Sequence, residues 1–91
     1  MRLEVYLSYG EREGMFRTEL HIDGIIPSEA LIGEFPKEKV ADFVGNFYEE
    51  LESRGINVQV GVKNRGIEDA LYEDIKDQVS RKTKSIKATL N

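Results

Sequence analysis

Hydrophobic and polar residues alternate in two runs near the start of the chain. In residues 2–9, Leu3, Val5 and Leu7 fall on one side of an extended chain, and residues 15–22 repeat the alternation after the polar turn 10–14. A period of two is typical of a strand with one buried face. The two runs therefore predict an N-terminal antiparallel β-hairpin.

The pattern is weaker between the hairpin and residue 35. Asp23 and Gly24 form a second turn signal, and Pro27 ends any strand that begins at Ile25. Residues 30–35 fit either a short third strand beside the hairpin or irregular chain, and the sequence leaves both open.

After Pro36 the hydrophobic period becomes that of a helix. Five apolar residues fall within about 100° of one another on a helical wheel: Val40, Phe43, Val44, Phe47 and Leu51. Pro36 suits the first turn, and Gly55 suits a left-handed cap. Gly45 falls outside the apolar stripe, so we expect a tolerated surface glycine there rather than a close approach or a bend, although it costs about 1 kcal/mol relative to alanine.

Residues 56–63 alternate again and predict another strand. A second helix follows from near Ile67, because Ile67, Leu71, Ile75 and Val79 are spaced by four. Acidic residues open this helix and basic residues close it, which complements the helix dipole. Residues 85–90 fit either a continued helix or a short closing strand, and we expect the helix to end near Lys84.

These elements predict an α+β fold in one domain that covers residues 1–91. The expected order is a hairpin, a short third strand if residues 30–35 are extended, then α-β-α and, in one reading, a last strand. The expected architecture is a small mixed sheet with two helices on one face. The chain has 91 residues, 40% of them hydrophobic, which is enough for one core.

Composition narrows the class of function. The chain has no cysteine, which excludes disulfides, thiolate zinc sites and cysteine nucleophiles. It shows neither a secretory signal nor an apolar run near the roughly 20 residues of a membrane span. We expect a cytoplasmic protein without membrane contact. The 33% of charged residues, with few amides, favours a thermophilic source.

The chain has a net charge of −4, and its charged residues are distributed unevenly along the sequence. Residues 1–80 hold 9 basic against 17 acidic residues, whereas residues 81–91 are basic without acids. An acidic body argues against general nucleic-acid binding, but the basic segment makes RNA binding an alternative function, with Tyr6 as the stacking partner. The candidate contacts are Lys63, Arg65, Arg81, Lys82, Lys84 and Lys87. A charge bias at a helix C-terminus explains most of them without a ligand.

Two further candidates concern cations and catalysis. Glu73 and Asp77 of the second helix are weak candidates for a divalent-cation site, although a solvated helix face explains them better. His21, the only histidine, could act as a general base with Asp23, with Ser8 across the hairpin. A solvated surface histidine fits its place on the polar face better, so we assign no catalytic residue, expect no cofactor and do not expect an enzyme.

The turn from residue 63 to residue 66 leads from a strand into a helix, as phosphate-binding loops do. Glu68 and Asp69 follow it, however, and occupy the positive end of the helix that an anion would seek. Gly66 is the only glycine in the turn, which falls short of a phosphate-loop pattern. We expect a helix start that satisfies its own backbone groups.

The sequence favours a small non-catalytic binding domain that self-associates or joins a larger complex, with a protein or a second copy as its partner. The irregular segment holds either a candidate interaction patch or a loop that covers the core, and the sequence favours neither. Its apolar residues are Ile25, Ile26, Leu31 and Ile32. A free edge of the hairpin offers one route to a homodimer.

Overall fold

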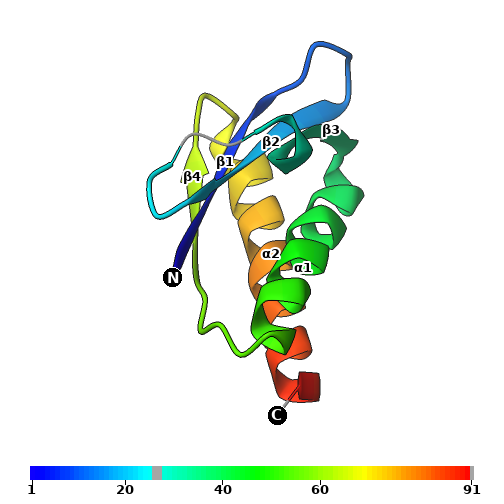
Figure 1. Ribbon diagram of the computed structural model, residues 1–91. Helices are drawn as coiled ribbons and strands as arrows, with labels where there is room; N and C mark the ends of the chain where they lie inside the picture. The colour runs from blue at the N-terminus through cyan, green and yellow to red at the C-terminus, as the bar shows by residue number, and fades with distance from the viewer. Residues whose placement is uncertain (26–27, 91) are drawn as a thin grey trace.

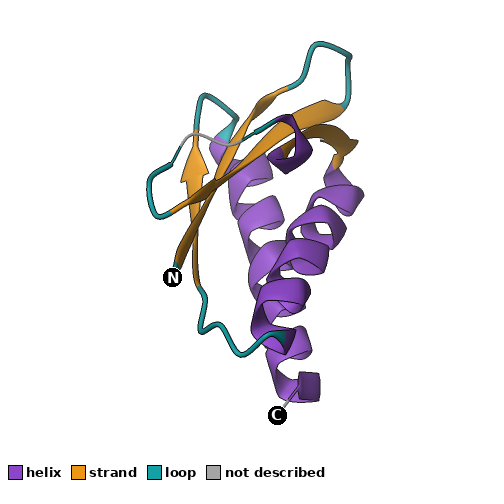
Figure 2. Ribbon diagram, viewed as in Figure 1, coloured by secondary structure: helices purple, strands orange, loops and turns teal. Residues whose placement is uncertain are grey.

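The computed structural model describes residues 1–25 and 28–90, which form two layers: a four-stranded mixed sheet and two helices packed on one of its faces (Figures 1 and 2). The strand order is β3-β2-β1-β4. The elements are β1 (Arg2–Tyr9), β2 (Met15–Ile22), the 3₁₀ turn η1 (Glu29–Leu31), β3 (Ile32–Pro36), α1 (Lys37–Ser53), β4 (Gln59–Asn64) and α2 (Asp69–Leu90). The predicted α+β class with an N-terminal hairpin is confirmed.

The hairpin forms the centre of the sheet. β1 pairs with β2 antiparallel, from Leu3 opposite Ile22 to Tyr9 opposite Phe16. β4 pairs with the other side of β1 in parallel, and β3 with the other side of β2 antiparallel. The expectation that the hairpin presents a free edge is therefore wrong, because both of its strands are covered. The free edges belong to β3 and β4.

The core lies between the sheet and the helices, where the alternation and the helical stripes placed it. Leu3, Val5 and Leu7 have no exposed surface. The fully or almost fully buried side chains that meet them include Leu20, Val40, Val44, Ile75 and Val79. Tyr48, which the predicted stripe of α1 left out, is 4% exposed and widens that stripe.

A tight turn follows β2, at the predicted Asp23 and Gly24. Both have positive φ, 49° and 79°, as a type I′ turn requires. The Ile25 N–H donates to the Ile22 carbonyl over 2.9 Å, and the Arg2 N–H donates to Asp23 Oδ1 over 2.7 Å. Of the two readings of residues 30–35, the structure supports the short third strand, which begins at Ile32. Pro27 lies outside the described residues.

The expected end of the second helix near Lys84 is wrong, since α2 continues to Leu90 without a closing strand. Its weak helix formers donate hydrogen bonds to carbonyls of their own helix, Thr83 Oγ1 to Ser80 over 3.1 Å and Thr89 Oγ1 to Ser85 over 3.0 Å. Thr83 is buried, and Ile86 packs against the core. Packing against α1 outweighs the slightly poor helix propensity of this segment.

Gly45 explains how α2 packs so closely. The expectation of a surface glycine is wrong, because Gly45 is buried and a Cβ placed there would lie 2.8 Å from Lys82 Cγ and 3.2 Å from Ile86 Cδ1. The missing side chain lets α2 approach α1.

Within the described residues, no helix is both long and apolar enough to cross a membrane.

We expect Gly45→Val to lower the free energy of unfolding by about 1–3 kcal/mol, because the branched side chain forces the two helices apart. This loss should appear although valine is the better helix former. Urea denaturation followed by circular dichroism measures it.

Asn46→Val is the matched control, because Asn46 is exposed beside Gly45 and asparagine and valine have similar helix propensities. It should change the stability by no more than about 0.5 kcal/mol. Equal losses in both variants would show that helix packing is not the cause.

Candidate functional site

The sheet face opposite the helices is polar and concentrates charged and aromatic side chains. Cross-strand register places them side by side on the three strands β1, β2 and β4, with one residue just beyond β4. They are Arg2, Glu4, Tyr6, Arg17, Glu19, His21, Lys63 and Arg65.

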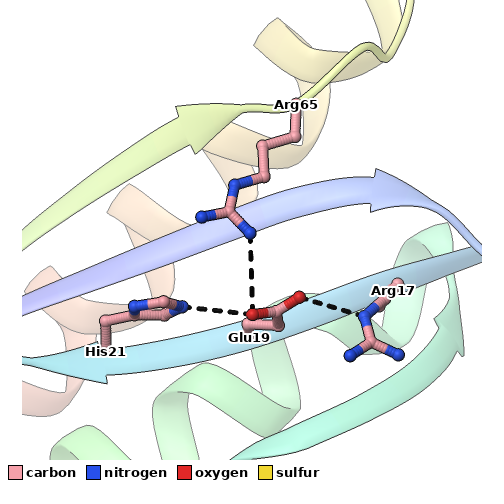
Figure 3. Close-up of polar contacts among 4 residues, drawn as sticks. All are labelled: Arg17, Glu19, His21 and Arg65. Carbon is pink, nitrogen blue, oxygen red and sulfur yellow. Dashed lines mark hydrogen bonds and ion pairs between the residues drawn. The ribbon is translucent and has the colours of Figure 1, made fainter. Parts of the chain in front are cut away.

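Glu19 is the centre of this face (Figure 3). Arg17 Nε donates to Glu19 Oε2 over 3.0 Å, while His21 Nε2 lies 3.1 Å and Arg65 Nη1 3.6 Å from Glu19 Oε1. The hydrogen bond from Arg17 holds the pKa of the Glu19 carboxyl below its ordinary value, against the opposing effect of burial, with further lowering by His21 and Arg65. Glu19 is therefore ionised at neutral pH and pairs with one arginine on β2 and one in the turn after β4.

Tyr6 completes the group, which we call the Glu19 cluster: Tyr6, Arg17, Glu19, His21 and Arg65. The Tyr6 and His21 rings are 4.3 Å apart and tilted by 55°, and Arg65 Cζ lies 4.0 Å from the centroid of the Tyr6 ring. Arg65 is thus held by a cation–π contact on one side and by Glu19 on another.

The expectation of a solvated His21 is wrong, because the residue is 8% exposed. It lies on the polar face as predicted, but Tyr6 and Glu19 cover it. The Asp23 carboxylate accepts a hydrogen bond from the Arg2 N–H instead, and Ser8 lies opposite Arg17 rather than His21. The structure thus does not bring together the His–Asp–Ser grouping considered from the sequence.

The acidic and basic side chains of this face differ in their exposure to solvent. The Glu4 and Glu19 side chains are only 15% and 16% exposed. Those of Arg2, Arg17 and Arg65 are 51%, 47% and 48% exposed. The carboxylates therefore lie beneath a layer of guanidinium groups, and solvent meets mainly the positive groups.

A second candidate lies at the edge of the sheet, between β4 and α2. A groove of about 320 Å³, the β4 groove, is lined by three valines, Val60, Val62 and Val79, and by three basic residues, Arg2, Lys63 and Lys76. Its volume is at the lower end of the range for ligand sites. Arg2 and Lys63 belong to both the groove and the polar sheet face.

One wall of the β4 groove is the free edge of β4. The N–H groups of Gln59 and Arg65 donate to Met1 and Leu7 on the β1 side, so residues 60, 62 and 64 turn their backbone groups outward by alternation. The Tyr72 hydroxyl donates to the Val62 carbonyl over 2.7 Å. No hydrogen bond recorded in residues 1–25 and 28–90 engages the outward groups of Val60 or the Val62 N–H.

The basic residues predicted to bind RNA do not form one surface. Arg81 pairs with Asp77, and Lys82 Nζ lies 3.4 Å from Asp42 Oδ1, both within the helical layer. Lys84 and Lys87 are exposed on α2. Among the contacts recorded for the described part of the chain, none joins these four residues to Lys63 or Arg65.

The cation candidates Glu73 and Asp77 are both exposed on α2, and Asp77 pairs with Arg81. In the described ranges no group of three or more histidine, aspartate or glutamate residues converges as metal ligands would. A cation site there stays a prediction.

The predicted interaction patch is divided. Ile25 is 69% exposed, Leu31 packs against the core, and Ile32 lies on β3 opposite Glu19. Ile26 lies outside the described residues. Of the described members, Ile25 alone presents most of its surface to solvent.

The turn after β4 starts α2 much as expected. The Asn64 side chain accepts a hydrogen bond from the Ile67 N–H over 2.8 Å and donates to its carbonyl over 2.9 Å. The Glu68 N–H donates to the Tyr9 hydroxyl over 3.1 Å, and Gly66 has a φ of 95°. The side chains of Asn64 in the turn and of Tyr9 on β1 therefore satisfy the backbone N–H groups of Ile67 and Glu68.

Sequence reasoning did not single out Arg2, Arg17, Glu19 or Lys76. Arg17, Glu19 and His21 occupy alternate positions of residues 15–22, so alternation puts them on one face, and this was the available signal for the cluster. Arg65 joins them only because β4 lies parallel beside β1, and the pairing of distant strands cannot be read from local alternation.

Comparison of the chain with family models, with curated proteins and with solved structures found no match.

We expect Glu19→Gln to destabilise the protein by about 1–2 kcal/mol at neutral pH, because it weakens charge-assisted hydrogen bonds in a covered position. The pKa of Glu19 is lowered by folding, so its contribution is present above the ordinary carboxyl pKa and is lost as pH falls through the lowered value. The stability difference between the two proteins should therefore shrink in acid.

Thermal unfolding from neutral pH into acid measures this difference. Glu13→Gln, in the exposed β1–β2 turn, is the control and should follow the wild-type curve. A difference from Glu19→Gln that stays constant with pH would contradict the assigned role of its charge.

Proposed function

We propose that this chain is a protein-interaction domain that binds an extended, acidic segment of a partner protein along the free edge of β4. The observation that carries the proposal is the β4 groove, in which an unpaired strand edge, an apolar floor and three cations occur together. Strand addition of this kind obtains affinity from the main chain and specificity from alternate side chains.

The backbone geometry supports a short added strand. Val60 offers an outward N–H and carbonyl, and Val62 offers an outward N–H, which together suffice for a few main-chain hydrogen bonds. The helix α2 lies along the other side of the groove, where the exposed Lys76 flanks the added segment and Val79 is buried beneath it. An added strand would thus place one row of side chains over the valines and α2.

Charge favours an acidic partner over a second copy of this chain. Arg2, Lys63 and Lys76 line the groove, so pairing two β4 edges would bring like charges together. Carboxylates on an added strand would instead meet all three cations. The self-association expected from the sequence finds less support at this edge than a foreign acidic segment does.

A labelled peptide of alternating valine and glutamate tests the proposal. In a two-dimensional NMR titration, the amide signals of Val60 and Val62 should shift together with those of α2 near Lys76. Lys63→Glu with Lys76→Glu should weaken binding about tenfold, because reversal replaces attraction by repulsion at two positions.

Two controls separate strand addition from general charge attraction. Lys84→Glu with Lys87→Glu makes the same charge change outside the groove lining and should leave the affinity within about twofold. A peptide N-methylated on the amides that face β4 should bind more weakly than one methylated on the opposite amides, since only the first loses main-chain hydrogen bonds. Equal binding of the two methylated peptides would refute the proposal. So would a free protein of doubled mass whose Val60 and Val62 amide signals already have the positions expected with peptide, because a second copy would then occupy the edge.

A further inference from the structure

We infer that the polar sheet face is a second binding site, for single-stranded nucleic acid, centred on the Glu19 cluster. This inference is independent of the proposed function, since it rests on the face of the sheet rather than on its edge. It moves the candidate nucleic-acid contacts from the C-terminal part of α2 to the opposite layer of the molecule.

The first support is the fixed position of two arginines. Glu19 accepts a hydrogen bond from Arg17 Nε on one oxygen and forms an ion pair with Arg65 Nη1 through the other, so a single carboxylate orients both side chains. Figure 3 shows the two terminal nitrogens of Arg17 directed away from Glu19. Roughly half of each arginine side chain is exposed. Oriented guanidinium groups bind phosphate with less loss of side-chain entropy than free ones.

The second support is the aromatic contact of Arg65. Its guanidinium carbon lies over the Tyr6 ring, and the His21 ring packs beside Tyr6. The Arg65 guanidinium thus rests on the Tyr6 ring, which His21 supports from beside it, and about half of the Arg65 side chain stays exposed. Unpaired nucleobases stack on arginine planes as they do on aromatic rings.

The third support is the layering of charge. Glu4 and Glu19 are mostly covered, whereas Arg2, Arg17 and Arg65 form the outer level, and Lys63 is exposed on the neighbouring strand. A phosphate chain that crosses β2, β1 and β4 would meet cations on each strand while the carboxylates stay beneath them. The net −4 of the whole chain predicts a modest affinity with a strong salt dependence.

The combination of groups favours nucleic acid over an acidic protein. Carboxylates of a peptide would use the charge of Arg17 and Arg65 but not the planar stack over Tyr6. A single strand offers both phosphates and unpaired bases, so it uses both features. A duplex hides the faces of its bases and would use only the charge.

Fluorescence anisotropy with labelled oligouridine at low salt tests the inference. Arg17→Gln with Arg65→Gln should weaken binding by about tenfold or more and make the salt dependence less steep, by roughly one unit of slope for each lost phosphate contact. Arg65→Lys keeps the charge but removes the planar stack, and should weaken binding several-fold with the slope unchanged.

The controls locate the site. Lys84→Gln with Lys87→Gln removes the same charge from α2 and should change the affinity for oligouridine by less than about twofold. Lys76→Glu, which alters the β4 groove, should also change that affinity by less than about twofold. Shifts of the Tyr6 and His21 ring signals on adding oligouridine provide a readout that requires no variant, should the double arginine variant fail to fold.

Three results would overturn the inference. One is no binding of oligouridine at low salt, and another is an equal loss in the Lys84 and Lys87 variant. The third is binding of polyglutamate or duplex RNA as tight as that of oligouridine, because it would show that charge alone is recognised.

Discussion

Burial of one face of β1 is the constraint on which the rest of the structure depends. Leu3, Val5 and Leu7 are completely buried beneath the helical layer, and β1 is paired on both sides. Since β3 and β4 form opposite edges of the sheet, the chain between them must cross its whole width, and α1 makes that crossing. α2 then packs beside α1, so both helices lie on the same face, and no element of residues 1–25 and 28–90 covers the other face.

An uncovered sheet face can carry charge only if its groups compensate one another. In this protein the glutamate side chains are mostly covered and the arginine side chains are about half exposed. The opposite charges therefore neutralise one another within the sheet face, while the surface that solvent meets is mainly positive. Arg2 and Lys63 connect that surface to the β4 groove. The two proposed sites therefore share a boundary, and a ligand at one changes the electrostatic field at the other.

Local patterns could predict much of the fold, because alternation and helical spacing report the burial of each element. They identified the hairpin, both helices, the strand before α2 and the left-handed cap at Gly55, which has a φ of 82°. Local patterns failed where contact with a residue far away in sequence determines the structure. Gly45 is buried and α2 continues past Lys84 because the two helices meet there, and that contact joins residues far apart in sequence.

The candidate sites show the same limit more strongly. The common face of Arg17, Glu19 and His21 follows from alternation, but Arg65 reaches Glu19 only through the parallel pairing of β1 with β4. The C-terminal basic residues lie close together in sequence, without acids between them. In space, Arg81 and Lys82 are paired with acids of the helices.

The hydrogen bond from Tyr72 to Val62 has a consequence for the behaviour of the protein at high concentration. An open strand edge is a template on which further copies can pair without limit, as in amyloid. Here one outward carbonyl is already occupied by a hydroxyl from α2, and the helix stands beside the strand. This hydrogen bond leaves only a short run of outward backbone groups at β4, which disfavours the growth of a long β-ladder from that edge.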